Sequence, residues 1–554
     1  MGPYDNPDES YSFAEQNVFC QPKDLQVKDQ GLGEELEGDT KTVSIFELKF
    51  AKSFTPKTAC SMTYEAQQLA QLKDMIRRNF YYEFDYDNIP VYGFVGKYHE
   101  SERDGGQNYY LYTHYKFFIL YHQNVGDQTG YIVHVNITRD IDSVVLINDK
   151  VKSIDFKYSA TWIKSDIAFD DRDQVWTNQF FTFQMYQAEM EIHWLSIFNS
   201  FVLVLLLTAF VALILMKILN RDYVRYSTED KDETEYGWKQ VASDAFRFPI
   251  HENIFCALVG VGSQFIVMAV FLLFLAIIGL SYPGNDGAMR VSAVVLYALT
   301  ALISGFVSSF WYKKMEGPSW PWNILLTASV FALPFLIMAF FVNSVAIFHH
   351  VTKALPITAI LAVLLIWLLV GIPLTVVGGI TGKNYSSPFV PPVRVKKGAR
   401  ELPYVPWYRR LPIQMLMGGF LSFSAIYVEL HYIFHSVWGR GFYHLWGILF
   451  LVFIILLIVT ATTTIALTYF QLSMEDYRWW WASFLTGGST GIFIFGYSIY
   501  YYIYRSRMTG FLQASFYFGY QGLICYYFFL MLGAVGFFSS YLFVRQIYKN
   551  IHTD

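Results

Sequence analysis

Apolar residues gather into long runs from residue 193 onward. Each run is about twenty residues or longer, which is the length an α-helix needs to cross the hydrocarbon core of a bilayer. A window of that length predicts nine transmembrane helices. They lie at 193–219, 252–280, 289–312, 322–348, 355–381, 412–438, 445–470, 481–504 and 514–543. The sequence therefore predicts an α-helical polytopic membrane protein whose two ends lie on opposite sides of the membrane.

The residues before these runs show the shorter periods of a domain that folds in water. Residues 131–138 alternate apolar and polar side chains, as in a half-buried strand that turns His134 and Asn136 to its polar face. Residues 46–50 alternate in the same way, whereas residues 65–80 place apolar side chains at helical spacing. We predict a β-rich, sandwich-like domain with one inserted helix.

The composition agrees with two domains, one that folds in water and one that folds in lipid. The chain is 54% hydrophobic and only 16% charged, which is too few charges for a soluble protein of this size. We place the boundary near Ile192, so that residues 1–191 form the β-rich domain and residues 192–554 form the nine-helix domain with a short tail. The net charge of −4, with no basic cluster among aromatics, argues against a nucleic-acid partner.

The basic residues indicate an orientation. If the N-terminal domain is lumenal, Lys and Arg concentrate on the cytosolic loops and tail, as the positive-inside rule expects. Two segments, 220–251 and 382–411, supply most of them, and we expect both to be hydrated loops. The second loop is also expected to meet anionic lipid of the bilayer. The prediction is a lumenal N-terminus and a cytosolic C-terminus.

The first residues lack the charged start and apolar stretch of a secretory signal peptide. A domain of this size needs help to cross a membrane. We therefore expect either a signal peptide encoded upstream of Met1 or translocation directed by the first transmembrane helix.

A lumenal domain leads to two predicted covalent features. Cys20 and Cys60 are the natural disulfide pair, because Cys256 and Cys525 lie inside apolar runs. Asn136 begins the sequence Asn-Ile-Thr and is a candidate N-glycosylation site, although such triplets often arise by chance.

Few ionisable residues fall inside the predicted spans. The clearest are Glu429 and His431, and such residues are candidates for function. Glu429 lies about 25 Å along its helix, so we expect its carboxylate to reach water near the lumenal interface. Two residues correspond to roughly 200° of helix rotation, so the two side chains should point to opposite faces. A transport path through Glu429, His431 and the threonines at 460–464 is the alternative.

Tryptophans and paired glycines lie within or beside several of the predicted spans. The run 479–481 follows Arg478, and tryptophan favours the headgroup zone, so interfacial anchoring is the prediction and docking of a partner the alternative. Paired glycines predict close helix packing, and the alternatives are a surface that recognises client helices or a transport path. These pairs are Gly260 and Gly262, Gly418 and Gly419, and Gly487 and Gly488.

The sequence contains no zinc-protease helix, nucleophile elbow, phosphate-binding glycine loop or paired-cysteine metal spacing. We therefore predict a protein that is not an enzyme and that needs no cofactor.

Four segments together resemble the transmembrane 9 superfamily, also called nonaspanins or the endosomal membrane protein 70 family. They are residues 2–11 with 19–20, residues 192–200, residues 236–239 with 244–247, and residues 469–472 with 475–481. The last contains the most recognisable signature, Glu475, Asp476, Tyr477, Arg478, Trp479, Trp480 and Trp481. The resemblance covers essentially the whole chain in order.

The resemblance implies a lumenal β-domain, nine spans and residence in Golgi and endosomal membranes. It implies a role in sorting or surface delivery of other membrane proteins, including cargo with glycine-rich transmembrane segments, and roles in adhesion and phagocytosis for some members. The implied partners are client membrane proteins, vesicle coats that contact the C-terminal tail, and the lipid bilayer. A transporter or channel for a small solute or ion is the alternative function.

The resemblance also implies two trafficking signals in the tail. Phe543, Val544 and Tyr548 resemble the aromatic coat-export element of the family. The family's terminal Lys-x-Asp retrieval signal is altered, because His552 stands where the family has lysine and Asp554 follows. Histidine is mostly neutral at cytosolic pH. We therefore expect weak retrieval to the Golgi and more weight on endosomes.

Overall fold

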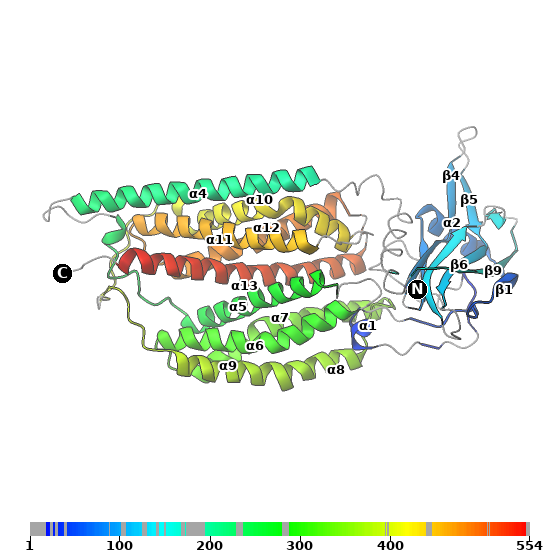
Figure 1. Ribbon diagram of the computed structural model, residues 1–554, viewed down its shortest axis with the longest axis horizontal. Helices are drawn as coiled ribbons and strands as arrows, with labels where there is room; N and C mark the ends of the chain where they lie inside the picture. The colour runs from blue at the N-terminus through cyan, green and yellow to red at the C-terminus, as the bar shows by residue number, and fades with distance from the viewer. Residues whose placement is uncertain are drawn as a thin grey trace.

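A β-rich domain sits at one end of a long helical bundle (Figure 1). This computed structural model describes the whole chain except residues 1–10, 12–17, 23–25, 28–30, 38–40, 88, 101–106, 124–129, 140–142, 149–150, 168–171, 173–193, 229–236, 280–286, 394, 396–397, 439–445, 507, 509 and 550–554. We call the end of the bundle next to the domain proximal and the opposite end distal. The predicted boundary near Ile192 lies outside the described residues.

The N-terminal domain contains three small sheets. A mixed four-stranded sheet has the order β1 (Phe54–Thr63), β9 (Ser153–Lys164), β6 (His114–His122) and β7 (Tyr131–Arg139), in which only the β6–β9 pair is parallel. The second sheet is the hairpin β2 (Tyr81–Tyr86) and β3 (Ile89–Phe94), and the third has the order β4 (Gly96–Glu100), β5 (Gln107–Tyr112) and β8 (Val144–Leu146). The prediction of a β-rich domain with an inserted helix is confirmed.

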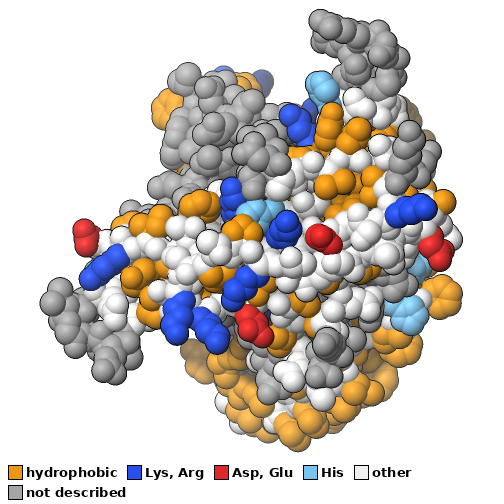
Figure 2. Space-filling model, turned by 90° about the vertical axis from the view of Figure 1, so that its right-hand side faces the viewer, with side chains coloured by type: hydrophobic (Ala, Val, Ile, Leu, Met, Phe, Trp, Pro, Cys, Tyr) orange, Lys and Arg blue, Asp and Glu red, His pale blue; other side chains and the backbone are white. Residues whose placement is uncertain are grey.

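Residue periodicity explains the core of this domain. Strand β9 alternates buried and exposed side chains along its length, with Phe156, Tyr158 and Trp162 among the buried ones. Helix α2 (Ala66–Arg77) buries Leu72 and Ile76 and begins with a capping box in which Glu65 and Gln68 satisfy each other's backbone N–H groups. Figure 2 looks onto this end of the molecule and shows charged side chains of both signs on its surface.

Two local predictions in the domain need correction. Residues 46–50 form no strand, because they pair with no neighbour; instead Phe46 packs against the rings of Tyr115 and Phe117, so the alternation is that of an extended segment lying on the core. Strand β7 forms as predicted, but His134, which was expected on its polar face, is buried.

The predicted disulfide joins Cys20 to Cys60, with Cα atoms 6.0 Å apart. It ties the N-terminal segment to β1. The neighbouring residues Val18 and Phe19 are buried in the core, and the Tyr64 hydroxyl donates a hydrogen bond to the Val18 carbonyl oxygen at 2.9 Å.

The bundle consists of long helices that run side by side (Figure 1). They are α4 (Trp194–Thr228), α5 (Glu252–Ile277), α6 (Ala288–Lys314), α7 (Trp320–Phe348), α8 (Ile357–Ile366) continued by a π-helical turn (Trp367–Gly371) and α9 (Ile372–Tyr385), α10 (Leu411–Trp438), α11 (Trp446–Ser473), α12 (Trp479–Tyr504) and α13 (Phe511–Lys549). The π turn lies just before Pro373, whose ring and missing N–H disrupt regular α-helical bonding.

Eight of the described helices are long and apolar enough to cross a membrane. The ninth predicted span is α12, which lies among the others in Figure 1 but carries glycine, serine, threonine and tyrosine in place of aliphatic residues. At their distal ends α4 and α13 run on as helix past the predicted limits of 219 and 543.

The paired glycines pack against helices of the same chain. A Cβ on Gly487 would lie 2.5 Å from the Leu532 carbonyl oxygen of α13, and one on Gly260 would lie 2.6 Å from the Ser304 carbonyl oxygen of α6. A Cβ on Gly419 would lie 2.6 Å from the Ser489 hydroxyl of α12. Close packing is confirmed, and these surfaces are already occupied inside the bundle.

Candidate functional site

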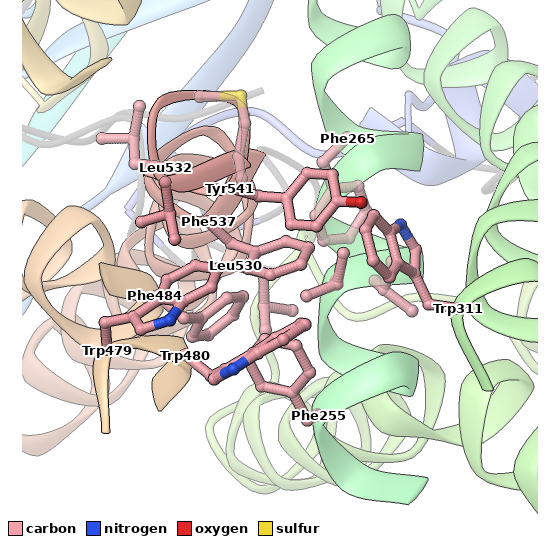
Figure 3. Packing of buried hydrophobic residues seen from close by; sticks show 14 of the residues in the cluster. Phe255, Phe265, Trp311, Trp479, Trp480, Phe484, Leu530, Leu532, Phe537 and Tyr541 are labelled. Carbon is pink, nitrogen blue, oxygen red and sulfur yellow. The ribbon is translucent and has the colours of Figure 1, made fainter. Parts of the chain in front are cut away.

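The family-signature segment 475–481 lies at the distal end of the bundle, inside a large aromatic cluster. We call this group the distal cluster. Figure 3 shows Trp479, Trp480 and Phe484 of α12 facing Phe537 and Tyr541 of α13, with side chains of α5 and α6 opposite. The ring centroids of Trp479 and Trp480 lie 4.6 Å apart, and those of Trp311 and Tyr541 lie 4.7 Å apart in an edge-to-face arrangement.

The prediction of interfacial anchoring is wrong for Trp479 and Trp480 of the tryptophan run. Trp479 and Trp480 are 0% and 2% exposed, so both indoles lie inside protein and not at the lipid headgroups. The Trp479 ring N–H donates to the Ala245 carbonyl oxygen at 2.7 Å, and the Trp481 ring N–H donates to the Ile250 carbonyl oxygen at 2.8 Å. The segment 237–250, between α4 and α5, therefore covers the run.

Residues 220–251 were predicted to be a hydrated loop, and the prediction is wrong for residues 238–246. Trp238, Val241 and Phe246 are buried in the distal cluster. The signal that identifies them is the presence of large aromatic side chains within a charged loop. Such side chains lose water contact by folding onto the end of the bundle.

Charged signature residues fix the turn that leads into α12. The Arg478 guanidinium donates to both carboxylate oxygens of Asp476 at 3.0 Å, in the paired geometry that arginine favours. Arg400 donates to Glu475 at 2.9 Å and to the Gln240 side chain at 2.9 Å. The loops before α5, α10 and α12 thus converge on one polar junction above the distal cluster.

The predicted coat-export residues lie in the last helical turns of α13. Val544 and Tyr548 are both 0% exposed, and the Tyr548 hydroxyl donates to the Trp238 carbonyl oxygen at 2.7 Å. Phe543 is partly buried against the same cluster. Val544 and Tyr548 are therefore enclosed by protein, and the coat-export role of the three residues stays a prediction. His552 and Asp554 lie outside the described residues.

Glu429 and His431 point to different neighbours, as predicted. His431 Nδ1 lies 3.0 Å from the Tyr497 hydroxyl of α12. Glu429 is two helical turns from Ser422, so it shares the face on which Ser422 accepts a hydrogen bond from Thr460 of α11. The expected water contact is wrong, because Glu429 is only 5% exposed between the helices.

Thr464 and Thr468 of α11 join this helix to α13, whereas Thr462 bonds within α11. Thr464 shares a hydrogen bond with Ser539 of α13 at 3.1 Å, and Thr468 shares one with Ser540 at 2.9 Å. Thr462 bonds to the Ile458 carbonyl oxygen of its own helix at 2.9 Å. The hydroxyls of Thr464 and Thr468 are therefore used for packing between helices of the bundle.

A groove opens between α10 and α12 on the outer surface of the bundle. Its volume is about 510 Å³, and it is lined by Phe423, Tyr427, Ile492, Phe493, Gly496, Tyr497 and Tyr500. This site was not predicted from the sequence, because neither helix forms the groove alone. The only sequence signal is a glycine set among tyrosines and phenylalanines on α12.

Asn136 lies in β7 with a partly exposed side chain, and its glycosylation stays a prediction. Among the residues that the structure describes, no group of three or more His, Cys, Asp or Glu is placed to hold a metal ion.

Comparisons with known proteins cover nearly the whole chain. The sequence profile of the Endomembrane protein 70 family matches residues 10–511. The chain is 43% identical to transmembrane 9 superfamily member 4 of Arabidopsis thaliana and 45% identical to member 1 of Mus musculus, in each case over 100% of the chain and 93% or 92% of the relative. It is 47% identical to the putative phagocytic receptor 1b of Dictyostelium discoideum, covering 93% of it. No solved structure matches the chain.

Proposed function

Because the chain belongs to the Endomembrane protein 70 family, the transmembrane 9 superfamily, we propose that it sorts or delivers other membrane proteins, particularly cargo with glycine-rich transmembrane segments. It acts without catalysis, in Golgi and endosomal membranes. Its N-terminal domain is lumenal and its distal end cytosolic. Lys313, Lys314, Lys383 and Arg409 at the distal ends of their helices or beside them support this orientation.

One observation carries the proposal: the interior glycine and threonine surfaces are occupied by the chain's own helices, so a client must meet a lipid-facing surface. Helix α4 offers such a surface. Only 6% of its most apolar window is buried, and Leu206, Phe210 and Leu213 are each more than 60% exposed. A bulky face of this kind complements the small-residue face of a glycine-rich span, where the client backbone can approach closely.

Coats then contact the parts of the tail that are open to them. Val544 and Tyr548 are held inside the distal cluster, so of the three predicted tail residues Phe543, which is partly exposed, is left for contact with a coat.

The proposal is tested by photo-crosslinking in cells. A photoreactive residue replaces Phe210 on α4 or, as the control, Leu369, which is 70% exposed on the π turn between α8 and α9. We expect membrane proteins with glycine-rich spans to be captured at position 210 and not at position 369, and their surface level to fall when the gene is deleted. Equal capture at both positions, or an unchanged surface level after deletion, contradicts the proposal.

A transporter is the second candidate, and the buried carboxylate of Glu429 is the observation that favours it. In that case Glu429→Gln abolishes uptake of the solute or ion into proteoliposomes. If the same variant leaves delivery of client proteins intact and the unmodified protein shows no flux, the transport hypothesis is wrong.

A further inference from the structure

The groove between α10 and α12 has a polar end and an apolar end. Both helices begin at the distal end, so residue numbers rise toward the N-terminal domain along both. Ile492 and Phe493 therefore mark its distal part, and Tyr497 and Tyr500 its proximal part. From Ile492 to Tyr500 is about 12 Å along the helix. Helix α12 ends four residues beyond Tyr500, so the hydroxyls lie near the proximal membrane interface.

The walls of the groove are aromatic and already ordered. The rings of Phe423 and Phe493 are stacked with centroids 6.2 Å apart, and those of Tyr427 and Tyr497 meet edge to face at 5.5 Å. The hydrogen bond between Tyr497 and His431 holds the proximal wall. A preformed site of this size is typical of small-molecule sites and costs little reorganisation on binding.

The floor of the groove is open because of a glycine. No atom lies within 4 Å of the position that a Cβ would take on Gly496. The buried glycines of the same helix behave differently, since a Cβ on Gly488 would lie 2.7 Å from the Phe529 carbonyl oxygen. Gly496 therefore does not serve contact with a neighbouring helix of the chain, and it leaves room for an occupant that comes from the membrane.

Polarity selects the class of occupant. The seven described residues that line the groove carry no charge, so nothing among them would pair with a phosphate group. Tyrosine hydroxyls at the interface end suit one small neutral polar group, and flat rings along the rest suit a flat apolar body. A rigid body also loses less conformational freedom than a flexible acyl chain. We propose that the groove binds a lipid of the sterol class, with its hydroxyl at the Tyr497 and Tyr500 end.

This inference does not depend on cargo sorting and is tested separately. The full chain is reconstituted in phosphatidylcholine nanodiscs with a photoactivatable sterol analogue, and labelled peptides are identified by mass spectrometry. Label is expected on α10 and α12 and is expected to be displaced by unlabelled cholesterol. Gly496→Phe, which fills the floor, should reduce this label to background.

Gly522→Phe on α13 is the matched control, because Gly522 is also a helical glycine with no atom within 4 Å of a Cβ. It should leave the label unchanged. Tyr500→Phe removes a hydroxyl but keeps the ring, and the loss of one hydrogen bond should weaken sterol binding about two- to tenfold. This variant keeps the proposal falsifiable if Gly496→Phe does not fold.

Three results would overturn the proposal. The first is equal labelling of the groove in the Gly496→Phe and unmodified proteins. The second is displacement of the label by phosphatidylcholine as efficiently as by cholesterol. The third is capture of a protein, in place of sterol, by a photoreactive residue at Ile492 in cell membranes, because the groove would then bind a helix.

Discussion

Helices α4 and α12 belong to one bundle but use their side chains in opposite ways. Helix α4 has the highest mean hydropathy of the candidate spans, yet only 6% of its apolar window is buried. Among the long helices of the described bundle, α12 is the one that is not apolar enough to be a candidate span. Nevertheless, 15 of its 26 residues are buried. For these two helices, apolarity therefore reports contact with lipid and not position in the core.

The reason lies in what holds membrane helices together. Lipid chains are as apolar as leucine, so apolar side chains gain little by leaving lipid, and close backbone approach and hydrogen bonds provide the association. Helix α12 supplies both. Gly487, Gly488 and Gly491 meet backbone atoms of α13. The Ser489 hydroxyl donates to the Met415 carbonyl oxygen of α10, and the Ser498 carbonyl oxygen accepts from Tyr517.

The largest effect is expected from the distal cluster, where α12 buries its tryptophans. Trp480→Ala should lower the free energy of unfolding by about 3–5 kcal/mol, because it removes a fully buried indole and leaves a cavity. The measurement is thermal unfolding of the purified protein in nanodiscs. Trp407→Ala is the control, since Trp407 is 69% exposed. Equal loss of stability in both variants would place the tryptophan at the lipid interface after all.

A smaller effect is expected from overfilling the contact between α12 and α13. Gly487→Leu introduces a Cβ within 2.5 Å of the Leu532 carbonyl oxygen, and the helices must separate. The expected cost is about 1–3 kcal/mol, measured by the same thermal unfolding. Gly522→Leu adds the same side chain into open space on α13 and should be close to neutral. Tolerance of leucine at position 487 would show that the two helices do not pack as described.

The interhelical hydrogen bonds should each contribute less. Thr468→Val keeps the shape of the side chain but breaks the bond to Ser540, with an expected loss of about 0.6 kcal/mol. Thr462→Val is matched to it on the same helix, because Thr462 bonds only within α11 and faces outward. A double-mutant cycle of Thr468 with Ser540 measures the coupling, and a coupling of zero would contradict the proposed role of the bond.

The smallest effect is expected on α4. Phe210→Ala should change the free energy of unfolding by less than about 0.5 kcal/mol. The Phe210 ring is 62% exposed, so it contacts apolar lipid in the folded protein as well as in the unfolded one. The same variant should reduce capture of client proteins, if α4 is the client surface. A loss of stability comparable with that of Trp480→Ala would mean that α4 is covered by protein and not by lipid.

Much of the architecture was predictable, because lipid imposes strict local rules. A span must satisfy its backbone within the helix and present apolar side chains over its length, so the hydrophobic runs located the eight candidate spans of the described chain, together with the less apolar helix α12. The disulfide between Cys20 and Cys60 was predictable for a similar reason, since the other two cysteines lie inside spans. Helix α2 followed from its periodicity alone.

The sites were harder to predict, because their partners lie far away in the sequence. Trp479 is hydrogen-bonded to a carbonyl group 234 residues earlier, and Tyr548 to one 310 residues earlier. A tryptophan run after an arginine has the composition of an interfacial anchor, and an aromatic tail has the composition of an exposed signal. Only the folding of segment 237–250 over the distal end turns both into buried packing.

The sequence by itself determined the division between the two solvents, the positions of the spans and the pairing of the cysteines, because each depends on the side chains of a short segment. The tertiary structure alone decided that Trp479 and Trp480 are buried, that the tail residues Val544 and Tyr548 are enclosed, and that a groove opens between α10 and α12. These outcomes depend on which helix surfaces meet, and lipid gives no local preference that would mark those surfaces along the chain.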